Sequence, residues 1–237
     1  MRKVVICTPA HNGATDVLYT YALAETVRLG MQNGIAFLPL FLPGESLLSI
    51  ARNELFALAY QTDCTDTIWI DSDMGWDPVW CLKLLAHDVD VVSGTARRKS
   101  EIETYVCKCP PERLVVGPNG LIEVEGIGLA FTRLSRKAMD VLWNTAELYR
   151  TGDGQARRWI FNVQPIEGRV MSEDIAMCAQ FRAHGIVPYL DPTMTADHVG
   201  RHVFKGDFVK WMAEFKAASA IETRQPLSEV AKLPTLH

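Results

Sequence analysis

The first hundred residues alternate between short apolar runs and amphipathic stretches, and this alternation restricts the possible folds more than any other feature. The apolar runs are rich in β-branched residues and end at proline, glycine or aspartate, which predicts strands over 3–8, 35–41, 67–70 and 89–94. Apolar residues at helical spacing predict helices between them, over 16–29, 46–60 and 78–86. Such alternation predicts a mostly parallel central sheet with helices on both faces, an α/β fold.

The pattern becomes less regular after residue 100, but it continues as strand and helix. Helices are predicted over 135–150 and 173–184, and a strand over 186–192, followed by a polar loop over 193–202. We expect one domain over 1–215 and a loosely held tail over 216–237, because the last segment is short and contains two prolines.

Composition excludes some classes of function. The chain of 237 residues carries 24 Lys and Arg against 28 Asp and Glu, so its net charge of −4 provides no basic field for non-specific nucleic-acid binding. The longest apolar stretch, 35–43, contains two prolines, and the first apolar run is too short for a signal peptide. Six scattered cysteines without a CxxC pair indicate reduced thiols. We therefore expect a cytoplasmic protein with no membrane span.

Polar residues follow three of the predicted strands. Thr8, Pro9 and Ala10 end the first strand, Asp71 and Asp73 follow the third, and residues 94–99 follow the fourth. In an open parallel sheet ligands bind outside the carboxyl ends of the strands. These separate signals therefore predict a single site at that edge.

The segment IWIDSDMGWD, residues 68–77, places two carboxylates one residue apart directly after a buried strand. Asp71 and Asp73 could hold a divalent cation such as Mg²⁺ or Mn²⁺ with their hard oxygen ligands. The alternative is that the two acids only begin a solvated turn. Two residues at this spacing do not decide between these interpretations.

The wider sequence resembles the nucleotide-sugar-dependent glycosyltransferases of the A-type fold (GT-A). The segment 68–78 resembles their DxD signature, and the order of the other similar segments also matches. The similar segments are TPA at 8–10, SIARNELFALA at 49–59, VDVVSGTARRK at 89–99, GIGLAFTRLSRKAMDVL at 126–142 and SEDIAMCAQFRAHGIVPYLDPTMTADHVG at 172–200. The resemblance covers roughly residues 3–200, and small viral and bacterial members are most similar in layout.

This resemblance implies a role for each matching position. For the nucleotide and donor sugar it implies Thr8, Pro9, Ala10, Arg52, Asp71, Ser72 and Gly128. For a Mn²⁺ or Mg²⁺ ion it implies Asp71, Asp73 and His198 as ligands, and the imidazole favours Mn²⁺. For catalysis it implies Asp174 as the general base, with Glu173 as the second candidate.

Each of these residues also has an ordinary structural interpretation. Glu173 and Asp174 begin a predicted helix, where acids favour the positive end of the helix dipole. Arg52 could be a surface arginine whose stem covers apolar residues, and His198 could be a solvated loop residue. The residue types alone leave both interpretations open.

The resemblance implies a metal-dependent hexosyl- or pentosyltransferase that moves a sugar from a nucleoside-diphosphate sugar to a hydroxyl acceptor. The acceptor could be a sugar, a protein, a small molecule or a modified viral DNA base. The stereochemical course and the oligomeric state also stay open. A viral protein would act in the host cytoplasm. A sugar-phosphate nucleotidyltransferase is an alternative, but it would use a glycine-rich basic loop after the first strand, and residues 9–16 carry no lysine or arginine. A non-catalytic nucleotide-sugar-binding protein is the other alternative.

Overall fold

A computed structural model describes residues 1–100, 104–110, 113–166 and 168–200. Its centre is an eight-stranded sheet in which β9 runs antiparallel between β3 and β5, whereas β1 pairs in parallel with β2 and β3, and β5 with β14. The path through the sheet is β2 (Ile35–Pro43), β1 (Arg2–Ala10), β3 (Asp66–Ile70), β9 (Phe131–Ser135), β5 (Val91–Ala96), β14 (Pro188–His198) and β4 (Met74–Gly75), with β7 (Ile122–Glu123) also paired to β14.

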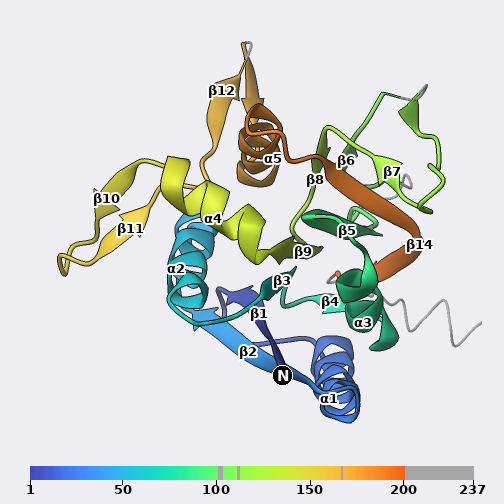
Figure 1. Ribbon diagram of the computed structural model, residues 1–237. Coiled ribbons are helices and arrows are strands. Elements are labelled where there is room, and N and C mark those ends of the chain that lie inside the picture. The colour runs from blue at the N-terminus through green and yellow to red at the C-terminus, as the bar shows by residue number, and fades with distance from the viewer. Residues whose placement is uncertain (101–103, 111–112, 167, 201–237) are drawn as a thin grey trace, which may run out of the picture. The chain divides into compact units, whose positions relative to one another are not determined.

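Helices cover both faces of this sheet. Figure 1 shows α1 (Val17–Gln32) and α3 (Val79–Ala86) on one side, and α2 (Leu48–Tyr60), α4 (Arg136–Thr145) and α5 (Glu173–Ala183) on the other. Each face has its own apolar core, one around Tyr19 and Ile70, the other around Phe56 and Trp69. The expected fold class, a single α/β domain with a mostly parallel sheet and helices on both faces, is confirmed.

Three small antiparallel ribbons complete the described part of the chain. They pair β6 (Cys107–Lys108) with β8 (Gly126–Ile127), β10 (Leu148–Arg150) with β11 (Ala156–Arg158), and β12 (Gln164–Ile166) with β13 (Arg169–Met171). Figure 1 shows the β10–β11 ribbon projecting away from the sheet. Among the residues that the model places, no helix is long and apolar enough to cross a membrane.

Local sequence explains where the helices begin and why their packing is close. The Asp16 carboxylate accepts from the Leu18 amide at 2.8 Å and caps α1, and the Ser135 hydroxyl accepts from the Ala138 amide at 3.1 Å and caps α4. At Gly30 a Cβ would lie 2.9 Å from the main-chain oxygen of Ile35, so only glycine allows α1 to approach β2 this closely.

Two predicted boundaries were wrong, and one lies outside the described residues. The helix predicted over 135–150 ends at Thr145, and residues 148–150 instead form β10. The polar loop expected from residue 193 is the second half of β14, which continues to His198 because it pairs with β5 and β4 there. The predicted domain boundary between 215 and 216 falls in 201–237, beyond the described residues.

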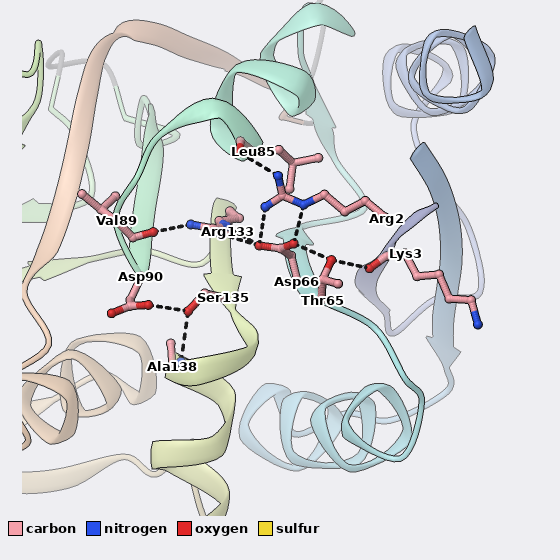
Figure 2. Close-up of polar contacts among 10 residues, drawn as sticks. All are labelled: Arg2, Lys3, Thr65, Asp66, Leu85, Val89, Asp90, Arg133, Ser135 and Ala138. Atoms are coloured by element: carbon pink, nitrogen blue, oxygen red, sulfur yellow. Dashed lines mark hydrogen bonds and ion pairs between the residues drawn. The ribbon is translucent and has the colours of Figure 1, made fainter. Parts of the chain in front are cut away.

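A buried ion-pair cluster fixes the amino-terminal end of β3. Asp66 is 1% exposed and accepts from Arg2 Nε at 2.8 Å and from Arg133 Nε at 2.6 Å (Figure 2). Burial raises the pKa of Asp66, but the Arg2 hydrogen bonds and the Arg133 charge outweigh it and hold the pKa below its usual value. The cluster ties β3 to β1 and β9, so the opposite end of β3 delivers Asp71 and Asp73 to a fixed place.

Candidate active site

The polar residues that follow the strands gather at the carboxyl end of the sheet, as expected. The turn after β3 carries Asp71 and Asp73, and β14 reaches it because His198 pairs with Met74 in the antiparallel β14–β4 ladder. Directly after β14 the Val199 amide donates to the Asp73 carbonyl oxygen at 2.9 Å. Segments more than a hundred residues apart in sequence therefore meet at one turn.

Arg52 joins two acidic segments of this site. It is 3% exposed; its Nη1 donates to Glu173 Oε1 at 2.6 Å and its Nη2 to Asp71 Oδ1 at 3.2 Å. One guanidinium thus holds the start of α5 against the turn after β3. The Arg52 Nε is also buried and has no hydrogen-bond partner among the described residues. The bracing of Asp71 by Arg52 is present, and contact of Arg52 with a nucleotide stays a prediction.

Asp73 lies between two nitrogen groups. The Lys99 ammonium bonds to Asp73 Oδ2, and His198 Nε2 lies 3.6 Å from Asp73 Oδ1. The other ring nitrogen, His198 Nδ1, lies 2.8 Å from the Arg97 carbonyl oxygen, which can only accept. Nδ1 therefore carries the hydrogen, and Nε2 is the ring nitrogen that faces Asp73.

Asp73 and His198 are arranged like two of the ligands of a metal site. The Asp73 Oδ1 and His198 Nε2 atoms lie 3.6 Å apart, and the imidazole is oriented by a hydrogen bond from its other nitrogen to a carbonyl, as is usual for metal-ligating histidines. Asp73 and His198 therefore fit a divalent cation. The described residues contain no cluster of three or more His, Cys, Asp or Glu groups that could hold a metal ion, and Asp71 is bonded to Arg52 instead. The three-ligand set of Asp71, Asp73 and His198 stays a prediction.

Asp174 lies at the start of α5 and is largely buried. Its Oδ1 accepts from the Ile175 amide at 2.8 Å and from the Ser172 hydroxyl, which bonds to this carboxylate rather than to a backbone amide. Its Oδ2 lies beside Gly128, where a Cβ would come within 3.3 Å of it and within 2.7 Å of Val106 Cγ1. A side chain at 128 would therefore collide with Val106 and crowd Oδ2. The base role of Asp174 stays a prediction.

The end of β1 is placed at the same edge of the sheet, but its side chains point into the core. Thr8 and Ala10 are buried, and the Thr8 hydroxyl bonds to the Tyr19 hydroxyl at 2.5 Å. A nucleobase at this strand end would therefore meet main-chain atoms of Thr8, Pro9 and Ala10. Ser72 is half-buried, and its carbonyl accepts from the Asp16 amide at 2.9 Å, which ties the turn to the start of α1.

For two residues of the site, sequence reasoning did not predict the contacts that they make. The contact of Lys99 with Asp73 was not predicted, although its position after the fourth strand placed it at the correct edge of the sheet. The anchoring contacts of Asn53 were also not predicted: its side chain accepts from the amides of Ile160 and Phe161 at 2.9 and 3.0 Å, and so anchors this loop beside Arg52. No spacing pattern in the sequence marks Asn53 as an anchor.

Comparisons with known proteins support the fold. No protein-family model matches the sequence, and no curated protein is detectably similar to it. Among solved structures, A197 from STIV is similar with a TM-score of 0.52 and 16% identity, over 87% of this chain and 98% of A197. At that identity the likeness concerns the fold alone: A197 and this chain share an overall fold.

Two weaker similarities have TM-scores below 0.5. The S. aureus TarS fragment 1–349, solved in complex with UDP-GlcNAc, gives 0.46 at 11% identity, over 97% of this chain and 68% of that fragment. The inositol-1-phosphate CTP transferase from T. maritima gives 0.44 at 11% identity, over 91% and 96%. At these scores neither similarity distinguishes between sugar transfer and nucleotidyl transfer.

Proposed function

We propose that this chain is a glycosyltransferase that moves a sugar from a nucleoside-diphosphate sugar to a hydroxyl acceptor. One observation carries the proposal: the segments that resemble the A-type family are in contact at one edge of the sheet. Arg52 bridges Asp71 to Glu173, and His198 lies beside Asp73. Contacts between such distant segments were implied by the family motifs and not by local sequence.

Asp73 and His198 would hold the divalent cation, Mn²⁺ or Mg²⁺, with Asp71 as the third predicted ligand. When bound, such an ion acts as a Lewis acid that stabilises the negative charge of the departing nucleoside diphosphate. The chain's own part is to orient these ligands: the Arg97 carbonyl fixes the His198 ring, and the Val199 amide fixes the main chain at Asp73.

Asp174 would accept the proton of the acceptor hydroxyl. Its Oδ1 is held by the Ile175 amide and the Ser172 hydroxyl, whereas Oδ2 lies beside Gly128 and would be the oxygen that takes the proton. Within the described residues no basic side chain forms an ion pair with Asp174, whereas Glu173 is already paired with Arg52. This difference favours Asp174 over Glu173 as the base in an inverting reaction. In a retaining reaction Asp174 would orient the donor sugar instead.

One alternative lacks a feature that its chemistry needs, and the other leaves features of the site without a use. A sugar-phosphate nucleotidyltransferase would draw the donor triphosphate into a basic loop after β1, and the segment 9–16 has no lysine or arginine. A non-catalytic binder needs neither a free carboxylate at Asp174 nor a second acid beside His198. The glycosyltransferase proposal uses both.

Calorimetric titration of UDP, GDP and their sugar conjugates, with and without Mn²⁺, tests the assignment of roles. We expect Asp73→Asn to weaken nucleotide binding and its Mn²⁺ dependence, while Asp174→Asn leaves both nearly intact and lowers transfer by about 10²–10⁴-fold, as the loss of a general base does. Asp63→Asn, at a carboxylate whose side chain is 75% exposed and which pairs with Lys3, is the control and should change neither. Equal loss of nucleotide binding in Asp174→Asn and Asp73→Asn would contradict the role given to Asp174.

A further inference from the structure

The two acids of the turn after β3 have positive partners of very different character. Asp71 is paired with Arg52, whose side chain is 3% exposed and is also held by Glu173. Asp73 is paired with Lys99, and these two side chains are 38% and 40% exposed. The first partner is fixed by burial, and the second lies at the surface of the site, where it can leave.

Lys99 neutralises the same carboxylate that is proposed to bind the cation. Its ammonium bonds to Asp73 Oδ2, while Asp73 Oδ1 lies 3.6 Å from His198 Nε2. A divalent ion held by Asp73 and His198 would lie beside this ammonium and be repelled by it. The cation and the Lys99 ammonium therefore weaken each other's interaction with the Asp73 carboxylate.

We propose that Lys99 is a displaceable counter-ion, which occupies Asp73 until a divalent cation and a nucleoside diphosphate bind together. The cation takes the carboxylate, and the released ammonium pairs with an oxygen of the diphosphate. This inference rests on the proposed function, since it assigns to Lys99 a place in donor recognition. It makes the cation bind weakly alone and more strongly with the diphosphate, which offers Lys99 a new anionic partner.

The surroundings of Lys99 allow this movement. Its stem passes over Gly200, where an added Cβ would lie 3.5 Å from Lys99 Cδ, in ordinary van der Waals contact. A lysine has four rotatable side-chain bonds and presents a compact ammonium, so the charge can shift by several ångströms without backbone movement. Arg52 has no such freedom because it is buried and bonded to two carboxylates.

The test compares cation and nucleotide binding in Lys99→Gln, Lys99→Arg and the wild type. Binding of Mn²⁺ to the donor-free protein is measured by electron paramagnetic resonance, and binding of the nucleoside diphosphate at saturating Mn²⁺ by calorimetry. Lys108→Gln is the matched control, because it also removes one half-exposed lysine from an ion pair, with Glu125 at 3.3 Å.

We expect two shifts of opposite sign in Lys99→Gln. The affinity for Mn²⁺ alone should rise about fivefold, since an exposed ion pair and the repulsion at short range are each worth up to about that factor. The affinity for the nucleoside diphosphate should fall by a similar factor. Lys99→Arg, which keeps the charge, and Lys108→Gln should both stay within about twofold of the wild type.

Other outcomes separate this inference from the proposed function. Unchanged or weaker Mn²⁺ binding in Lys99→Gln overturns the counter-ion role, even if the wild type binds nucleotide with Mn²⁺ as proposed. Loss of both affinities indicates a structural role for Lys99 and overturns it as well. If no nucleoside diphosphate binds the wild type, the glycosyltransferase proposal fails; a tighter Mn²⁺ site in Lys99→Gln would still support competition for Asp73.

Discussion

Replacing Arg52 with methionine leaves Glu173 without its cation at the start of α5. The Glu173 side chain is 11% exposed and Arg52 Nη1 lies 2.6 Å from it, so the pair is effectively buried. Removing one partner of a buried pair typically costs about 3–5 kcal/mol, because the remaining charge is neither solvated nor paired. The second bond, to the more exposed Asp71, adds at most about 1 kcal/mol. We expect Arg52→Met to lower the free energy of unfolding by about 3–5 kcal/mol.

Urea denaturation followed by tryptophan fluorescence measures this loss. In the double variant Arg52→Met/Glu173→Gln no buried charge is left unpaired, so about half of the lost stability or more should return. Arg157→Met breaks a similarly buried pair with Glu54 at 2.6 Å and serves as the control: it should lower stability but leave nucleotide affinity unchanged, whereas Arg52→Met should lower both. Stability within about 1 kcal/mol of the wild type, or strictly additive effects in the double variant, would refute the bridging role of Arg52.

Three further perturbations probe the pH response, the proposed metal ligand and the core. Burial raises the pKa of Asp191, but hydrogen bonds from Lys83 and Thr193 lower it more, to about 2 from 3.8. Its contribution of about 2 kcal/mol is therefore present above pH 4 and lost as the pH falls toward 2, so urea denaturation between pH 5 and 2.5 should show a shallower loss of stability in Asp191→Asn than in the wild type. His198→Ala should raise the Mn²⁺ concentration needed for half-maximal nucleotide binding about tenfold or more. An unchanged Mn²⁺ titration would mean that His198 is a solvated side chain and not a ligand. Gly94→Ala should lower the thermal midpoint by several degrees, because the new Cβ would lie 2.9 Å from the Met194 carbonyl; an unchanged midpoint would mean that the strands separate freely there.

The sequence predicts the elements of this fold well where apolar periodicity is strong. The four strands and three helices predicted in the first hundred residues agree with the structure to within a few residues, because apolar side chains bury one face or more of each. The two-residue strand β4 was not predicted. The errors occur where pairing with segments distant in sequence determines the secondary structure. Residues 148–150, predicted as helix, form a strand because they pair with β11. The strand β14 extends to His198 because it pairs there with β5 and β4.

The site was predictable as a location but not as a set of contacts. The rule that ligands bind at the carboxyl ends of parallel strands brought Asp71, Asp73 and residues 94–99 to one edge. The pairing of Arg52 with Glu173 joins residues 121 positions apart in the chain, and the bond of Lys99 to Asp73 depends on side-chain direction. Neither follows from residue type or spacing, so charge partners have to be found in the structure.

Release of nucleoside diphosphate from a panel of nucleotide sugars tests the central claim most directly. Purified protein is incubated with each sugar nucleotide and Mn²⁺, and the nucleotide product is identified by chromatography. We predict that one donor yields the nucleoside diphosphate, that EDTA abolishes its release, and that Asp73→Asn loses it while Asp63→Asn keeps it. Release of inorganic phosphate or pyrophosphate instead, or no turnover of any nucleotide sugar, would contradict the assignment of a glycosyltransferase.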